Sequence, residues 1–284
     1  MPTAADHVVF STECVTIGAF RCATDHPSFR NSGPIQSDCF VFPRTAVLIQ
    51  HDNAHAFVAD PTIVTLYNRS QHYERRAVSA DGDRCDWFAV SPGLLREALL
   101  DRDPAAADHE RPIRFTHARA DASTYLAQRR LFIDASNPAD GDRLSVEERV
   151  VALLDRVLHL AYADERPASS GRLSPASELA DRAKRWVTPR VCERLTLAVI
   201  ARAVHCSVFH LCRSFRRATG LTLHAYRDQV RLRLALERLE DGERDLTRLA
   251  LDLGYSSHSH FTAAFRRSFC TSPSAARKLL IVRG

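Results

Sequence analysis

One pattern of residues occurs twice in the C-terminal third of this 284-residue chain, and it restricts that region to pairs of short helices. The second copy, residues 246–273, reads LTRLALDLGYSSHSHFTAAFRRSFCTSP. Its apolar residues recur at helical spacing, and Gly254 then ends the helix, because glycine enters a left-handed turn without steric cost. Ser256 or Ser257 can cap a second helix, whose phenylalanines face inward and whose arginines face outward.

The first copy, residues 195–220, reads LTLAVIARAVHCSVFHLCRSFRRATG and has the same order of apolar, turn and arginine positions. The offset between the copies is 49 residues before the turn and 50 after it, so the second copy has one extra turn residue. Residues 226–239 between them predict a single connecting helix. A helix, a sharp turn and a helix rich in hydrogen-bonding and basic side chains are typical of a helix-turn-helix. The repeat predicts two such units.

Residues from about 176 to 278 resemble the DNA-binding domain of the AraC/XylS family of bacterial transcription regulators. The resemblance rests on SVFHLCRSFRR, the connecting helix and LALDLGYSSHSHFTAAFRRSFCTSP. Most family members have glycine where His205 and Cys270 stand. We therefore expect a differently shaped first turn, without a left-handed residue at His205, and a small loss of stability at Cys270.

The resemblance also implies how each copy would contact double-stranded DNA, with one helix in each of two successive major grooves. The implied base-reading residues are Phe209, Cys212, Arg213, Arg216, His258, Ser259, Thr262 and Ala263. The implied phosphate contacts are Ser207, Arg217, Ser257, Arg266 and Arg267. The planar fork of Arg213 suits the two acceptors of guanine, and a phosphate contact is its alternative. Phe209 offers only apolar contact, for example to a thymine methyl group.

The charge distribution favours nucleic acid as a partner of the C-terminal part. Residues 175–284 contain 20 Lys and Arg against 10 Asp and Glu, whereas the whole chain has a net charge of only +5. The rest of the chain therefore has a net negative charge, and the positive charge concentrated in the C-terminal part suits phosphate binding. No apolar run reaches membrane-span length, and the eight cysteines form no CxxC pair, so we expect a reduced, cytoplasmic protein with no membrane contact. Cysteines serving as small core residues are the simplest interpretation, and a Cys39–Cys85 redox sensor is the alternative.

The N-terminal part predicts an antiparallel β structure. Short β-branched and aromatic runs alternate with turn signals over residues 8–90, which favours a small β-barrel or jelly roll. The family resemblance implies a cupin-like barrel that binds a small effector. We therefore predict an α+β chain with a cupin-like sensing domain (1–105), a helical segment (106–165), a linker (166–176) and an all-α DNA-binding domain (177–284).

The predicted barrel contains two sets of candidate ligand-binding residues. Aromatic candidates for an effector pocket are Tyr67, Tyr73, Trp87 and Phe88, and each could equally be core. A metal site formed by His51, His55 and His72 is conceivable, but the chain has no His-x-His pair and no nearby Glu, as cupin enzymes have. Solvated turn histidines are the alternative. We expect no cofactor, no metal and no enzymatic activity.

Two helices are predicted in the middle segment, at about 122–133 and 145–162. Ser145 with Glu148 has the spacing of a capping box. The apolar stripe of the second helix either packs on the barrel or forms a homodimer contact. The dimer candidates are Val150, Leu153, Leu154, Val157 and Leu158.

These observations predict a sequence-specific transcription regulator, controlled by a small effector. By family analogy it is an activator that contacts RNA polymerase. One alternative is a regulator without an effector, whose N-terminal domain dimerises or binds a protein. The other is a metal-using cupin enzyme fused to a DNA-binding domain.

Overall fold

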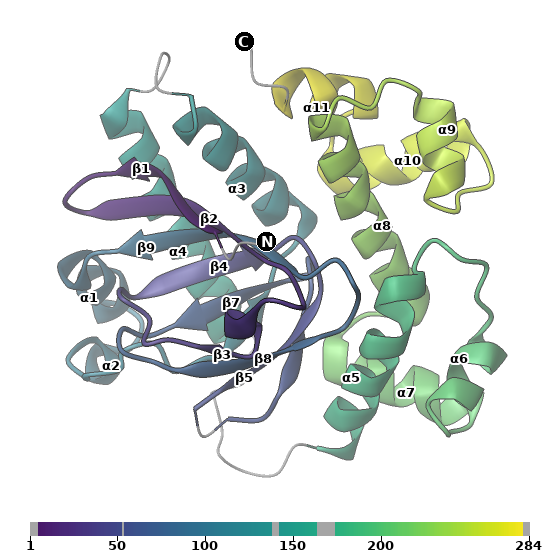
Figure 1. Cartoon of the computed structure of the whole chain (residues 1–284), viewed down its shortest axis with the longest axis horizontal. Coiled ribbons are helices and arrows are strands. Elements are labelled where there is room, and N and C mark those ends of the chain that lie inside the picture. Colours follow the sequence, from purple (N-terminus) through teal and green to yellow (C-terminus); the bar gives the residue numbers. More distant parts are fainter. Residues whose placement is uncertain (1–4, 53, 138–141, 164–173, 281–284) are drawn as a thin grey trace. The chain divides into compact units, whose positions relative to one another are not determined.

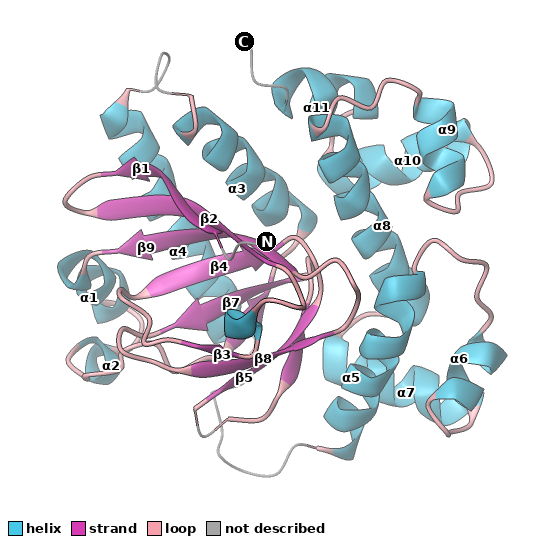
Figure 2. Cartoon of the chain, viewed as in Figure 1, coloured by secondary structure: helices cyan, strands magenta, loops and turns pink. Residues whose placement is uncertain are grey.

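The computed structural model describes residues 5–52, 54–137, 142–163 and 174–280. The chain divides into two compact units, residues 1–171 and 172–284, and each is described by itself. The first unit combines β-sheets with helices, and the second is entirely helical over its described residues (Figures 1 and 2). The α+β class predicted from the sequence is confirmed.

The first unit contains two antiparallel sheets. The six-stranded sheet has the order β1 (Ala5–Ser11), β2 (Val15–Cys22), β9 (Asp83–Val90), β4 (Cys39–Pro43), β7 (Ile63–Tyr67), β10 (His117–Arg119). The four-stranded sheet has the order β3 (Asn31–Ser32), β8 (Tyr73–Ala77), β5 (Val47–His51), β6 (Phe57–Ala59). Within the described residues the two sheets have no strand pair in common, so the predicted strands form without closing a barrel.

Alternation along the strands gives the six-stranded sheet two different faces. On one face Phe40, Phe42 and Phe88 form an aromatic cluster, with the Phe40 and Phe88 rings stacked 5.2 Å apart. Their immediate neighbours along the strands, such as Val41 and Trp87, point to the other side of the sheet, face the four-stranded sheet and line a cavity. The space between the sheets is therefore a place where this unit can hold a ligand.

Helices cover the aromatic face of the six-stranded sheet (Figure 1). Two of them, α3 (Ala122–Ala135) and α4 (Arg143–Ala163), pack together and contact β2 and β10 respectively. Arg129 of α3 is buried and donates to Asp86 of β9, which fixes the helix on the sheet. Two shorter helices, α1 (Pro92–Leu100) and α2 (Pro104–Ala107), follow β9.

The apolar stripe of α4 packs inside the chain. All five dimer candidates, from Val150 to Leu158, are buried within the single chain, so they offer no surface to a second copy. The homodimer assignment of these residues is therefore wrong, and internal packing is what the structure has. The predicted capping box is also wrong, because α4 begins at Arg143 and Val146 donates its backbone N–H to the Asp142 carbonyl. Ser145 thus lies inside the helix.

The second unit is built from α5 (Pro175–Val187), η2 (Thr188–Arg190), α6 (Leu197–Ala203), α7 (Val208–Thr219), α8 (Leu223–Glu240), α9 (Leu246–Asp252), α10 (His258–Phe269) and α11 (Pro273–Leu280). The long helix α8 packs against α7 of the first copy, and also against α10 of the second copy and α11, which follows it. It is the connecting helix predicted from the sequence. Of the predicted linker, residues 166–173 lie outside the described residues.

Candidate nucleic-acid interface and effector cavity

The turn between the two helices has the same backbone hydrogen bonds in both copies. After α6, Cys206 donates its N–H to the Ala201 carbonyl at 3.0 Å. After α9, Tyr255 donates to the Ala250 carbonyl at 2.9 Å, at the equivalent position. A bond that spans five residues back into the helix is the signature of a Schellman end, which needs one left-handed residue. The repeat read from the sequence is therefore a repeat of backbone geometry.

The left-handed residue of the first turn is His205, with φ of 56°, and that of the second is Gly254, with φ of 78°. Our expectation of a differently shaped first turn at His205 is wrong. Histidine can take the left-handed conformation at an energetic cost. The side chain of His205 is exposed to solvent, so no steric clash adds to this cost. Cys270 has φ of 55° at the end of α10, where the first copy has Gly220 with φ of 73°.

A serine caps the second helix of each copy. The side chains of Ser207 and Ser257 accept hydrogen bonds from the backbone N–H groups of His210 and His260, at 3.2 and 3.1 Å. Each cap fixes the start of a helix, and the buried phenylalanines of each helix then set its rotation about its axis. Phe215, Phe261 and Phe265 are fully buried. We call α7 and α10 the reading helices.

The opposite face of each reading helix carries the predicted DNA contacts. Phe209 is 75% exposed, an unusual position for a large aromatic side chain. In α10, Thr262 lies 3.3 Å from Nε2 of His258, so these two predicted base-reading side chains contact each other. Cys212 and Thr262 are half-buried. The other predicted contacts are exposed, namely Ser207, Arg213, Arg216, Arg217, Ser257, His258, Ser259, Ala263, Arg266 and Arg267.

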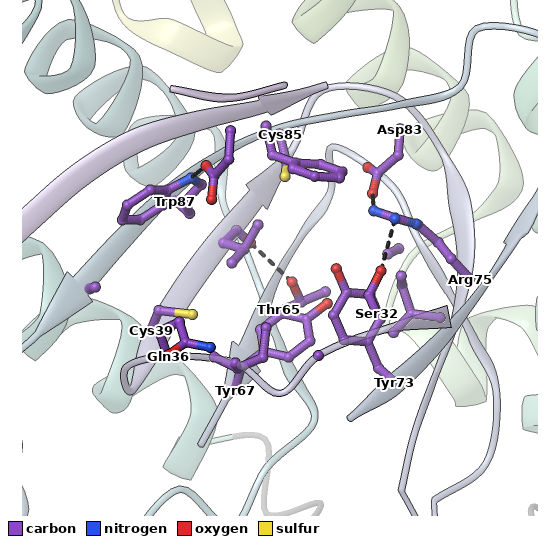
Figure 3. A pocket seen from close by; sticks show the side chains of 18 of the residues that line it. Ser32, Gln36, Cys39, Thr65, Tyr67, Tyr73, Arg75, Asp83, Cys85 and Trp87 are labelled. Carbon is purple, nitrogen blue, oxygen red and sulfur yellow. Dashed lines mark hydrogen bonds and ion pairs between the residues drawn. The ribbon is translucent and has the colours of Figure 1, made fainter. Parts of the chain in front are cut away.

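In the first unit, a cavity of about 510 Å³ lies between the two sheets (Figure 3). Three of the four aromatic residues predicted for an effector pocket, Tyr67, Tyr73 and Trp87, line it. The assignment of Phe88 is wrong: it follows Trp87 on the same strand, so it faces the opposite side of the sheet and joins the aromatic cluster. Trp87 lies across Gly18, where an added Cβ atom would come within 2.3 Å of its ring.

The sequence interpretation missed the charged pair in this cavity. Arg75 of β8 and Asp83 of β9 are both buried and form an ion pair at 2.5 Å, which joins the two sheets. At the other end, the indole N–H of Trp87 donates to Asp6 at 2.7 Å. Tyr73, Arg75 and Ala77 alternate along the strand and therefore share one of its faces, and this spacing could have indicated that Arg75 points inward. An arginine in a strand is, however, normally interpreted as a surface residue.

Two cysteines line the cavity, on neighbouring strands. Cys39 stands opposite Ala89 and Cys85 opposite Pro43, so they are separated by four positions of the ladder, about 13 Å at the usual rise. A disulfide needs Cα atoms within about 7 Å. Burial raises the pKa of Cys39 to about 12 and raises that of Cys85, so both thiols stay protonated. This geometry opposes the redox-sensor alternative for this pair.

The three histidines considered for a metal site do not gather into one. Within the described part of the chain, no group of three or more His, Cys, Asp and Glu side chains could hold a metal ion. His51 is instead buried beside Tyr67, with ring centroids 4.6 Å apart. Burial lowers the pKa of His51 to about 4, so its ring is neutral at physiological pH.

Comparison with known proteins places these observations in a class. Residues 200–279 match the model of a helix-turn-helix domain family. The regulatory protein SoxS of Salmonella typhimurium is 38% identical over 95 residues, which are 34% of this chain and 89% of SoxS. The transcriptional activator RhaS of Escherichia coli is 30% identical over 93 residues, 33% of this chain and 34% of RhaS. The duplicated helix-turn-helix geometry, the family match and the two relatives together define a helix-turn-helix transcription regulator.

The chain belongs to the AraC/XylS family of DNA-binding transcription regulators. Among solved structures, a crystal structure of ToxT from Vibrio cholerae aligns over 95% of this chain and 99% of ToxT, with 9% identity and a TM-score of 0.42. None of the described helices has both the length and the apolar character required to cross a membrane.

Proposed function

We propose that the chain is a sequence-specific transcription regulator, that it activates its targets, and that a small effector bound in the cavity of the first unit controls it. In this proposal residues 177–284 are the DNA-binding domain and residues 1–105 a cupin-like sensing domain, joined by the helical segment 106–165 and the linker 166–176. RhaS, a relative in the DNA-binding part, is described as an activator. In this proposal the protein acts in the cytoplasm, contacts RNA polymerase and has no enzymatic activity.

The observation that carries the DNA-binding proposal is the duplicated turn with its serine-capped reading helix. Two helices fixed in the same way on one connecting helix can each enter a major groove, with successive grooves about 34 Å apart on one face of the duplex. Base-edge contacts come from the residues named above on α7 and α10, and phosphate contacts from Arg217, Arg266, Arg267 and the two capping serines. Base contacts specify the sequence, whereas phosphate contacts set the position.

Selecting duplexes bound by the full-length chain from random or genomic DNA tests this proposal. We expect enrichment of a site with two conserved segments about 10 base pairs apart, one for each reading helix. Binding without any enriched sequence, even in low salt, would refute sequence-specific recognition. The genes beside the enriched genomic fragments would also indicate what the first unit senses.

The cavity supports control by an effector over the alternative of a regulator without one. A space of about 510 Å³ between two sheets, with aromatic and polar walls, is of the size that holds small molecules. A ligand that binds there stabilises the folded chain, so a metabolite screen by thermal shift tests this part. Metal analysis of the purified protein tests the alternative of a metal-using enzyme. The homodimer also stays a prediction, without an assigned surface.

A further inference from the structure

Two charged groups that line the cavity, Arg75 and Asp83, are already paired with each other. Among the described residues that line it, Arg75 is the only base, and Asp6 and Asp83 are the acids. Figure 3 shows Arg75 and Asp83 together at one end of the cavity and Trp87 at the other. A ligand that enters this space therefore meets a neutral ion pair rather than an unpaired positive charge.

The guanidinium of Arg75 is occupied by the protein on its edges and its faces. Nε donates to the Phe29 carbonyl at 2.8 Å, Nη1 to Asp83, and Nη2 to Oγ of Ser32 at 2.9 Å. The ring of Phe20 lies 4.7 Å from the guanidinium carbon, and that of Phe29 lies 5.2 Å away. The residue is 1% exposed. A ligand carboxylate would have to break these contacts to reach Arg75.

Among the described side chains that line the cavity, none other than Arg75 carries a positive charge. Arg75 donates to Asp83 at 2.5 Å, and this contact with a guanidinium favours the ionised carboxylate, whereas burial raises the pKa of Asp83. His51 packs behind Tyr67 and Tyr73, and its ring is neutral because burial lowers its pKa to about 4. Burying an unpaired anion is costly, because it loses its hydration without gaining a counter-charge.

The remaining polar groups are suited to an uncharged ligand oxygen. Burial raises the pKa values of Tyr67 and Tyr73, so both hydroxyls keep their protons and can donate. Their rings lie 5.0 Å apart and point their hydroxyls toward the space in Figure 3. Apolar side chains make up much of the remaining wall, namely Val41, Val47, Ile49, Ala59 and Trp87. Such a surface favours an apolar body with one or two acceptor oxygens.

We infer that the cavity takes an uncharged, largely apolar molecule with a carbonyl, hydroxyl or ether oxygen, and that it discriminates against carboxylates. The inference rests on the proposed effector function and specifies the chemical class of the effector. The discriminating element is the Arg75–Asp83 pair, which presents no net charge. The tyrosine hydroxyls are the groups that would bind the ligand oxygen.

The test compares two probes of nearly the same shape that differ in charge, 2-acetylnaphthalene and 2-naphthoate. Binding to the full-length chain is measured by quenching of tryptophan fluorescence, since Trp87 lines the cavity, and by thermal shift. We expect the ketone to bind at least about ten-fold more tightly than the carboxylate, because only the carboxylate loses hydration without gaining a counter-charge. Acetophenone and benzoate form a smaller pair, so that size does not decide the result.

A variant links the discrimination to the ion pair. Asp83→Asn keeps the shape of the side chain but removes its charge and leaves Arg75 unpaired. We expect this variant to bind 2-naphthoate more tightly relative to the ketone than the wild type does. Asp81→Asn, two residues away on an exposed turn, is the matched control and should leave the ratio unchanged. If Asp83→Asn does not fold, the ratio of the ketone affinity to the carboxylate affinity in the wild type still tests the inference.

The possible outcomes separate this inference from the proposed function. Equal or tighter binding of the carboxylates by the wild type would overturn the inference and leave an effector cavity in place. Failure of all four probes to bind, while DNA binding persists, would overturn both the inference and the effector part of the proposed function. An unchanged ratio in folded Asp83→Asn would show that the ion pair does not set the selectivity.

Discussion

The two helix-turn-helix copies have the same backbone but place their glycines differently. Each copy has two left-handed positions, one in the turn and one at the end of the reading helix. The first copy has His205 in the turn and Gly220 at the helix end, whereas the second has Gly254 and Cys270 in the equivalent places. The fold therefore imposes the left-handed geometry at all four positions. Whether glycine is required there depends on what surrounds each one.

Surroundings explain why glycine is needed in the second turn. A Cβ atom on Gly254 would come within 2.4 Å of the Cys192 carbonyl oxygen and within 2.7 Å of Nη2 of Arg231. The carbonyl belongs to the backbone and cannot move aside easily. His205, by contrast, is exposed to solvent. The strain at His205 is thus only that of the backbone angle, while at Gly254 a steric clash is added.

The largest effect is expected from Gly254→Ala, which should destabilise the second copy by about 3 kcal/mol, from the left-handed angle and the clash together. Hydrogen exchange at the amides of α8 and α9 would measure this locally. Gly242→Ala is the matched control, because Gly242 has φ of 91° but no atom within 4 Å of an added Cβ. It should cost only about 1 kcal/mol. Equal losses in the two variants would show that the clash is relieved.

The outer faces of the reading helices differ more than their backbones. The first presents Phe209 and Arg213, and the second presents Ser259 and Ala263 at the equivalent positions. We expect Arg213→Ala to cost about 1–3 kcal/mol of binding to the selected site and to relax selectivity at one base pair. Arg266→Ala is the control, expected to weaken binding to all sequences and to reduce its salt dependence. If Arg213→Ala weakened binding to selected and random DNA equally, it would be a phosphate contact.

Phe209 sharpens the same comparison, because the thymine C5 methyl is the apolar group that the major groove offers. If Phe209 contacts that methyl, replacing one thymine of the selected site by uracil should cost about 1 kcal/mol, the value of one buried methyl group. Phe209→Ala should remove the difference between the two duplexes. The same replacement in the half of the site read by α10 is the control and should not depend on Phe209. A uracil penalty that persists in Phe209→Ala would assign the methyl contact to another residue.

Sequence patterns predicted the second unit better than the first, for a physical reason. In the second unit the signals are local: helical spacing, capping serines and turn residues lie within a few positions of each other. In the cavity the decisive contact joins Arg75 and Asp83 across two sheets, which depends on how the sheets stack. Strand β8, with its sequence YERRA, lacks the apolar alternation of a half-buried strand, since its most buried side chain is an arginine. The misassignment of Phe88 was avoidable, because neighbours on a strand face opposite sides.

The smallest effect concerns the strained residue of the first turn. His205→Gly should stabilise the first copy by about 0.5 kcal/mol, because relief of the left-handed angle exceeds the larger chain entropy that glycine has when unfolded. His205→Ala is the control: it removes the side chain but keeps the strain, so it should give no gain. Cys270→Gly should give a similar gain at the end of α10, since Cys270 is also exposed. Hydrogen exchange at the amides that follow each position measures both gains. A loss of stability in His205→Gly would mean that the histidine side chain contributes contacts that outweigh its backbone strain, and the two turns would then differ in more than their tolerance for a Cβ atom.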